Sequence, residues 1–214
     1  MSQRRMSLGK QALMSWIMGF FLGPVGDWFH VRTGATGYPD GAYAFYFPGG
    51  VPWWVPLLFA TATMTIGLSH TFGDELVRKH GPAWAMKPLW GGTARPGLTG
   101  MAPLIRGLLV FELAYIVSGY LPRPAGGAAD LILGAVAVAA WLAFDRTVHG
   151  AVLALSTAAA GVFVEATLVA HGVFHYGPET SNLFGVASWL PWIYVCASFA
   201  AGNFSRWRAY GFEA

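Results

Sequence analysis

Two carboxyl side chains stand inside strongly apolar stretches, Glu112 in residues 104–120 and Glu165 in residues 151–173. An ionised carboxylate at membrane depth costs at least a few kcal/mol, so each group is expected to be protonated, hydrogen-bonded, paired or turned towards a cavity. Such a carboxyl group can serve as an acid or base, or it can hold a polar group of a ligand. It can equally be satisfied by neighbouring helices, and the residues alone leave these roles open.

The spacing of the two carboxyl groups argues against a directly paired acid and base. With a rise of about 1.5 Å per residue, Glu112 lies about 9 Å deeper than Arg106, and Glu165 lies about 21 Å from the start of its stretch. These depths predict that the two groups occupy opposite leaflets of a bilayer. A reaction that needs two adjacent carboxyl groups is therefore not expected.

Histidines near the same boundary provide a second possible chemistry. His171 and His175 are four residues apart and are expected to share a helix face, close to Asp27 and His30 of the first predicted helix. The pair lacks the glutamate of a metalloprotease motif, so neither a metal site nor a cofactor is predicted. The single cysteine, Cys196, excludes an intrachain disulfide, a thiolate metal cluster and a Cys-x-x-Cys redox pair.

Six apolar stretches must position these groups. They cover residues 11–28, 51–70, 104–120, 131–144, 151–173 and 184–204 of the 214-residue chain. A helix of about 20 apolar residues crosses a hydrocarbon core of roughly 30 Å, and flanking side chains compensate for a shorter stretch. With 55% hydrophobic and 11% charged residues, the sequence predicts one integral membrane domain over residues 1–214. The first stretch lacks a cleavage pattern and is expected to remain as a helix.

Basic residues are distributed unevenly between the two sides of this six-span arrangement. Eleven lie on the side of the two termini, and two, Arg32 and Arg123, lie on the other side. By the positive-inside rule, both termini and the segment 71–103 are predicted to be cytoplasmic. The net charge of +3 is thus explained by topology, and nucleic acid is not expected as a partner.

Two charged residues, Asp145 and Arg146, close the fourth stretch at the predicted cytoplasmic face. Arg146 fits a charged stop at the end of a membrane helix, but this leaves Asp145 unexplained. The fourth and fifth stretches are rich in alanine and glycine, which let helix backbones approach closely. Such faces suit packing within the bundle or self-association, so a homo-oligomer remains open.

Several short blocks of sequence occur in a fixed order from the second stretch to the sixth. They are Trp53-Trp54-Val55-Pro56 with Ile66-Gly67-Leu68, Trp141 with Phe144-Asp145-Arg146 and Gly150, Gly172-Val173-Phe174-His175-Tyr176, and Ser188-Trp189-Leu190-Pro191 with Gly202-Asn203 and Arg206. Together they resemble the Insig proteins, the membrane sterol sensors of eukaryotes. The Ala- and Gly-rich, Cys-poor composition suggests a bacterial homologue.

The resemblance implies an all-α, polytopic membrane protein: a six-transmembrane-helix bundle with a lipid-accessible cavity, non-enzymatic, binding a sterol. In a bacterial cell membrane, rather than the endoplasmic reticulum, a diacylglycerol-like or isoprenoid lipid fits equally well. The resemblance assigns Phe111 and Trp141 to lipid binding and Asp145 to contact with a Scap-like partner. Glu112 and Glu165 depart from the family pattern, so the polarity of the pocket is expected to have moved, and both are included among the lipid-binding residues.

Two other functional classes remain. A membrane enzyme acting on an isoprenoid or other lipid would use Glu112 or Glu165 as acid or base, although no complete catalytic constellation is visible. A small transporter would require paired broken half-helices in two related halves, which the sequence does not show. The preferred hypothesis places a lipid between the third, fourth and fifth stretches, with Pro24 and Pro191 bending their helices to open that space.

Overall fold

The computed structural model describes residues 6–39, 50–121 and 127–213. Arg4, Arg5 and Arg123, which entered the charge count above, lie outside these residues. The described chain forms an all-α fold of six long helices: α1 (Leu8–Thr33), α2 (Val55–His80), α3 (Met101–Ser118), α4 (Ala128–Phe144), α5 (Val148–Ala170) and α6 (Leu190–Tyr210). Two 3-10 turns, η1 (Ala83–Met86) and η2 (Pro96–Leu98), lie between α2 and α3. The predicted fold class is confirmed.

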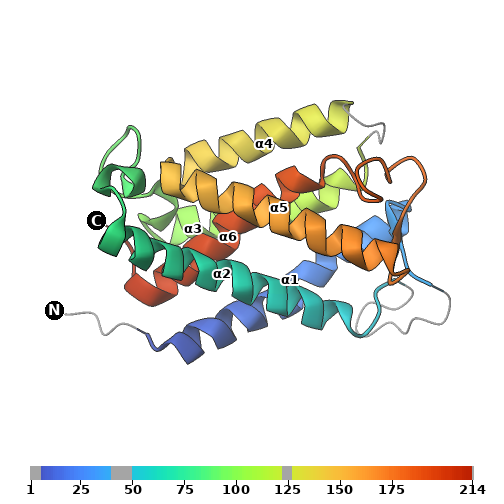
Figure 1. The fold of residues 1–214 in the computed structure, drawn as a ribbon, viewed down its shortest axis with the longest axis horizontal. Helices are drawn as coiled ribbons and strands as arrows, with labels where there is room; N and C mark the ends of the chain where they lie inside the picture. The colour runs from blue at the N-terminus through green and yellow to red at the C-terminus, as the bar shows by residue number, and fades with distance from the viewer. Residues whose placement is uncertain (1–5, 40–49, 122–126, 214) are drawn as a thin grey trace.

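The helices alternate in direction along one bundle. α1 begins and α6 ends at the same end of the molecule (Figure 1), which we call the terminal end, and the opposite end is the far end. At the far end, strands β1 (Thr36–Gly37) and β2 (His175–Tyr176) pair antiparallel, with Thr36 opposite Tyr176. This pairing holds the chain that leaves α1 against the chain that leaves α5.

α6 is the central helix. It contacts all five other long helices, and 13 of its 21 residues are buried. Small residues make these close approaches possible: a Cβ atom added at Gly202 would lie 2.5 Å from Nδ1 of His70 on α2. Because α6 is surrounded by protein, it can carry polar side chains without exposing them to lipid.

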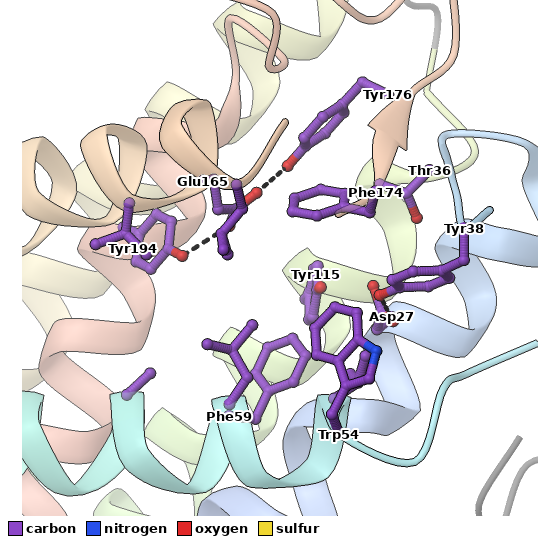
Figure 2. Close-up of a pocket in the computed structure, with 15 residues that line it drawn as sticks. Asp27, Thr36, Tyr38, Trp54, Phe59, Tyr115, Glu165, Phe174, Tyr176 and Tyr194 are labelled. Carbon is purple, nitrogen blue, oxygen red and sulfur yellow. Dashed lines mark hydrogen bonds between the residues drawn. The ribbon is translucent and has the colours of Figure 1, made fainter. Parts of the chain in front are cut away.

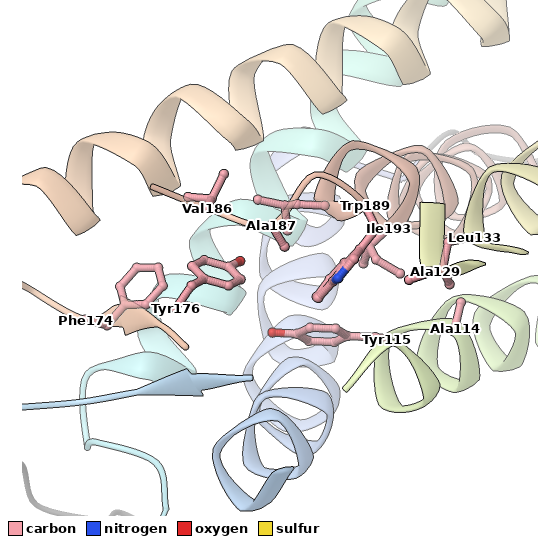
Figure 3. Close-up of a cluster of buried hydrophobic side chains, with 11 residues drawn as sticks. Ala114, Tyr115, Ala129, Leu133, Phe174, Tyr176, Val186, Ala187, Trp189 and Ile193 are labelled. Carbon is pink, nitrogen blue, oxygen red and sulfur yellow. The ribbon is translucent and has the colours of Figure 1, made fainter. Parts of the chain in front are cut away.

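A cluster of buried apolar side chains fills the far half of the bundle (Figure 3). Tyr115 of α3 and Trp189 at the start of α6 are two of its aromatic members, and both rings contact the ring of His30. Leu133 joins the cluster from α4, and Tyr176 joins from β2. The cluster therefore ties α3, α4 and α6 to the β1–β2 strand pair.

The surface has the polarity of a membrane protein. Within the described residues, α2, α3 and α5 are each long and apolar enough to cross a membrane, and α4 is a shorter apolar helix of 17 residues. α1 and α6 are less apolar for a structural reason. α6 is enclosed by protein, and α1 buries small and polar residues such as Ser15 and Gly19 while exposing Leu13, Ile17 and Phe21. Small, polar groups inside and large, apolar groups outside are typical of a helix in lipid.

The helices differ in detail from the predicted stretches. α2 continues to His80, ten residues beyond the expected end, and α6 begins at Leu190, six residues later than expected. Pro191 consequently lies in the first turn of α6, where a proline fits without bending the helix. The expectation that Pro191 kinks its helix was wrong. Pro24 does lie inside α1.

Candidate functional site

A cavity of about 470 Å³ lies between α2 and α5, with Tyr194 of α6 at its wall. We call it the α2–α5 cavity. It exists because the residues that face one another across it are mostly small, so they leave the space between the two helices unfilled. Its walls are formed by Leu58, Thr61, Ala62, Thr65, Ile66, Ser69, Leu153, Ser156, Thr157, Ala160, Gly161, Val164 and Tyr194.

Three hydroxyl groups on the α2 wall of this cavity are already bonded to their own helix. Thr61 donates to the Leu57 carbonyl oxygen at 2.9 Å, Thr65 to that of Thr61 at 2.8 Å, and Ser69 to that of Ile66 at 2.8 Å. Each therefore presents mainly carbon to the cavity. The volume falls within the range of about 300–1,000 Å³ that is typical of small-molecule sites. The cavity thus suits a mostly apolar ligand.

A second, smaller cavity of about 70 Å³ adjoins the first, and two carboxyl groups lie in its walls (Figure 2). We call it the Asp27–Glu165 chamber. Four residues, Leu58, Ala62, Val164 and Tyr194, line both spaces. The chamber is otherwise enclosed by Asp27, Thr36, Tyr38, Trp54, Val55, Phe59, Tyr115, Glu165, Leu168, Phe174 and Tyr176. The β1–β2 pairing contributes Thr36 and Tyr176, so the strand pair closes the chamber.

Tyrosine hydroxyl groups hold both carboxyl groups of the chamber. Tyr38 donates to Asp27 Oδ2 at 2.6 Å, while Tyr176 and Tyr194 donate to the two oxygens of Glu165 at 2.5 and 2.6 Å. Burial, followed by the charge of Asp27, raises the pKa of Tyr38 above its ordinary value. Burial, followed by the charge of Glu165, does the same for the pKa of Tyr176. These hydroxyl groups therefore remain proton donors, which keeps the carboxyl oxygens in the role of acceptors.

Glu112 lies apart from both cavities' walls. Its carboxyl oxygens are buried and accept no hydrogen bond within the part of the chain that the structure describes. Glu112 is six residues from the end of α3, and Glu165 is five residues from the end of α5, so both lie about 8–9 Å from the far ends of their helices. The two groups share one half of the bundle, and the expectation of opposite leaflets was wrong because α3 begins at Met101, before Arg106.

Phe111 and Trp141 line neither the α2–α5 cavity nor the chamber. Phe111 stacks on Tyr115, with ring centroids 6.1 Å apart, and borders a small space of about 30 Å³ among α1, α2, α3 and α6. Trp141 donates from Nε1 to the Thr147 carbonyl oxygen at 3.0 Å and packs edge-on against Trp90. The expected cavity between the third, fourth and fifth helices is replaced by one between α2 and α5, because α6 packs against α5 on one side and against α3 and α4 on the others.

Asp145 is completely buried at the terminal end of the bundle, with 0% of the residue exposed. Its Oδ2 lies 3.2 Å from Nη1 of Arg206 and 3.7 Å from Nε of Arg95, and its Oδ1 accepts hydrogen bonds from the backbone and hydroxyl groups of Thr147. The carboxylate is enclosed by its own chain, so a partner cannot contact it directly in this conformation. A contribution of Asp145 to partner binding stays a prediction, and it would have to act through these contacts.

Arg206 is the centre of a network of buried charges that the sequence alone did not reveal. Its guanidinium donates from Nε and Nη2 to the two oxygens of Asp74 at 3.0 and 2.8 Å. Arg95 lies 3.5 Å from Asp74 and donates from Nη1 to Glu213 at 2.6 Å. We call these residues, with Asp145, the buried ion network. It joins α2, the loop before α3, the end of α4, α6 and the chain after α6.

The histidines do not assemble into a metal site. α5 ends at Ala170, so His175 lies in β2 and does not share a helix face with His171; both side chains are exposed. His30 is buried, with Nε2 2.9 Å from the Tyr115 carbonyl oxygen. Among the described residues, no cluster of three or more histidine, cysteine, aspartate or glutamate side chains could hold a metal ion.

The comparisons with known proteins agree on one family. No family model matches the sequence. The sequence is 26% identical to the Insulin-induced gene 1 protein of Danio rerio over 205 residues, which cover 96% of this chain and 74% of the relative. It is 32% identical to an INSIG protein homolog of Mycolicibacterium vanbaalenii over 184 residues, which cover 86% of this chain and 79% of that protein.

Solved structures show the same fold. A crystal structure of the mycobacterial Insig homolog MvINS aligns with a TM-score of 0.75 and 23% identity, covering 95% of each chain. A cross-linked MvINS trimer aligns with a TM-score of 0.76, covering 96% of each chain. The likeness therefore extends over nearly the whole bundle.

Proposed function

Because this chain belongs to the Insig family, we propose that it is a non-enzymatic membrane protein that binds one neutral lipid in the α2–α5 cavity and acts as a sensor or scaffold. The ligand is a sterol or another neutral lipid, such as a diacylglycerol-like or isoprenoid molecule. The observation that carries this proposal is the cavity of about 470 Å³ between two membrane-crossing helices.

The chemistry of the cavity supports an apolar guest. Burial of apolar area is worth about 25 cal/mol per Å² when the ligand comes from water, and less when it comes from the bilayer. Shape and a few polar contacts must therefore distinguish the ligand from bulk lipid. The α2–α5 cavity provides the shape, and the adjoining chamber provides the polar groups.

An enzyme acting on an isoprenoid or other lipid is the alternative class. The structure gives it one supporting observation, since Asp27 and Glu165 line the same chamber. Such an enzyme predicts product formation that is lost in Glu165→Gln. A sensor predicts a changed lipid affinity in Glu165→Gln and no product from the unmodified protein. Incubation of the purified protein with an isoprenoid alcohol, followed by mass spectrometry of the extracted lipids, distinguishes the two.

Location and assembly follow the family. The protein is an integral membrane protein, and we place it in a bacterial cell membrane with both termini in the cytoplasm. The cross-linked trimer of MvINS supports a homo-oligomer for this chain as well. A Scap-like partner rests on family resemblance alone.

Lipid retention by the purified protein tests the proposal. Ala160 lines the cavity from α5, so Ala160→Trp should fill the space and remove the bound lipid. Leu155→Trp is the matched control, because Leu155 is 61% exposed on the same helix and does not line the cavity. Native mass spectrometry should find one lipid per chain in the unmodified protein and in Leu155→Trp, but none in Ala160→Trp.

Two results would count against the proposal. One is the absence of any stoichiometric lipid from the unmodified protein, and the other is full retention of lipid in Ala160→Trp. The assignment of Phe111 and Trp141 to lipid binding is tested in the same assay. Loss of lipid in Phe111→Ala or Trp141→Ala, with retention in Ala160→Trp, would move the ligand to the α3–α4 side of the bundle.

A further inference from the structure

The Asp27–Glu165 chamber is placed to contact one end of whatever occupies the α2–α5 cavity. The two spaces share Leu58, Ala62, Val164 and Tyr194 as wall residues. A ligand that fills the larger space therefore lies against the smaller one. The chamber, at about 70 Å³, has room for a few water molecules or for one small polar group. A bulky phospholipid headgroup does not fit this volume.

The lining of the chamber gives an anion no compensating charge. Among the residues that the structure describes, the lining contains two carboxyl groups and no lysine, arginine or histidine. A phosphate or carboxylate would face Asp27 and Glu165 without a cation to compensate, which is costly in a buried site. A permanent cation is disfavoured for a different reason, since it would have to give up its hydration and pass the apolar walls of the α2–α5 cavity. An uncharged polar group meets neither obstacle.

The hydrogen-bonding capacity of the chamber favours a group that can donate. Tyr38, Tyr176 and Tyr194 donate to the carboxyl groups, and a carboxyl oxygen that accepts one hydrogen bond still has a second lone pair. The remaining capacity at Asp27 and Glu165 is therefore that of acceptors. A ligand hydroxyl group can donate to them, whereas an ether or ester oxygen cannot.

Thr36 gives an independent indication of a ligand. Its Oγ1 is buried and has no hydrogen-bond partner in the described part of the chain, and the residue is only 5% exposed. It lines the chamber, where Figure 2 shows its oxygen turned towards Tyr38 and Asp27. A buried hydroxyl group without a partner costs free energy unless a bound group supplies the missing bond. Thr36 can donate to a ligand hydroxyl oxygen while that hydroxyl donates to a carboxyl oxygen.

From these observations we infer that the Asp27–Glu165 chamber recognises the hydroxyl group of an uncharged lipid alcohol whose apolar part lies in the α2–α5 cavity. The inference rests on the proposed function and adds the chemical class of the ligand. It also states what is rejected, namely lipids whose polar end is a phosphate, a carboxylate or an ether.

A competition among four probes that share one hexadecyl chain and differ in their polar end tests this specificity. The probes are hexadecanol, methyl hexadecyl ether, hexadecyl phosphate and hexadecylamine, each added to the full-length protein in detergent and counted by native mass spectrometry. We expect hexadecanol to bind at least about tenfold more tightly than the ether or the phosphate, since the latter two leave buried polar groups unpaired. Equal binding of hexadecanol and its methyl ether, or tighter binding of the amine, would overturn the inference.

Thr36→Val provides the matched variant, because it keeps the shape of the side chain and removes only the hydroxyl group. It should weaken the binding of hexadecanol and of the ether by similar factors, because the oxygen of either probe can accept from Thr36, while the preference between the two probes, which depends on the carboxyl acceptors, stays the same. A thermal unfolding midpoint no lower than that of the unmodified protein shows that the variant is folded. Thr167→Val is the control, since Thr167 is exposed on α5 outside both cavities and its hydroxyl bonds to its own helix. Unchanged binding of hexadecanol in Thr36→Val would contradict the assignment of Thr36 to the ligand.

The outcomes separate the two proposals. If no probe binds the unmodified protein, the proposed function fails and this inference fails with it. If all four probes bind equally and Ala160→Trp abolishes their binding, the lipid-binding function stands and the inference about the hydroxyl group is wrong.

Discussion

Replacement of Asp145 by asparagine removes one negative charge from the buried ion network while keeping the shape of the side chain. The carboxylate is 0% exposed and lies 3.2 Å from Nη1 of Arg206. Removal of one partner from a buried ion pair costs about 3–5 kcal/mol, because the other charge stays buried. Arg206 keeps both of its hydrogen bonds to Asp74, and asparagine can still accept from Thr147, so Asp145→Asn should lie near the lower limit, at about 3 kcal/mol.

Thermal unfolding of the purified protein in detergent measures this effect. For a chain of this size, about 1 kcal/mol corresponds to roughly 2–4 °C, so the unfolding midpoint of Asp145→Asn should fall by about 6–12 °C. Lys87→Met is the control, because Lys87 carries an exposed charge at the same end of the bundle. Its midpoint should stay within about 2 °C of the unmodified protein. A similarly small shift in Asp145→Asn would refute the view that Asp145 is a structural charge, and would favour a direct role at a partner surface.

Two further predictions concern the central helix and the chamber. Gly202→Ala should lower the free energy of unfolding by about 1–3 kcal/mol, because the added methyl group would meet His70. Gly9→Ala is the control and should not lower the free energy of unfolding, because the space around its added Cβ atom is open. Stability should also fall as the pH rises above about 10, because Tyr38 and Tyr176 have raised pKa values when folded and lose their protons more readily when unfolded. Denaturant titrations between pH 8 and pH 11 measure this loss of stability. If the variant with phenylalanine at both tyrosine positions loses as much stability over this range, the two tyrosines are not its cause.

The helices could be predicted from the sequence because a bilayer demands long apolar segments, and six such segments are visible. Their ends could not, because the ends depend on long-range contacts. α2 continues past His70 since Asp74 is neutralised inside the fold by Arg206, which is 132 residues away in the chain. The local sequence around Asp74 does not predict that pairing. The same holds for Asp145, whose partner Arg206 is 61 residues away.

The candidate site was only partly predictable. Glu165 stood out as a carboxyl group in an apolar stretch, and the structure places it in the wall of the chamber. Asp27 and Thr36 were not assigned to the site, because the strand pairing that brings Thr36 over the helices joins segments far apart in the sequence. A signal for the α2–α5 cavity was present, since Thr61, Thr65 and Ser69 recur at the four-residue spacing of one helix face. Which helix faces that stripe depends on the packing around α6.

The most direct measurement is an experimental structure of the protein purified with its native lipids. Elongated density between α2 and α5, in contact with Tyr194 and with its polar end at the Asp27–Glu165 chamber, is the predicted result. Density for a lipid between α3 and α4, or a space between α2 and α5 that is closed by the protein's own side chains, would contradict the central claim.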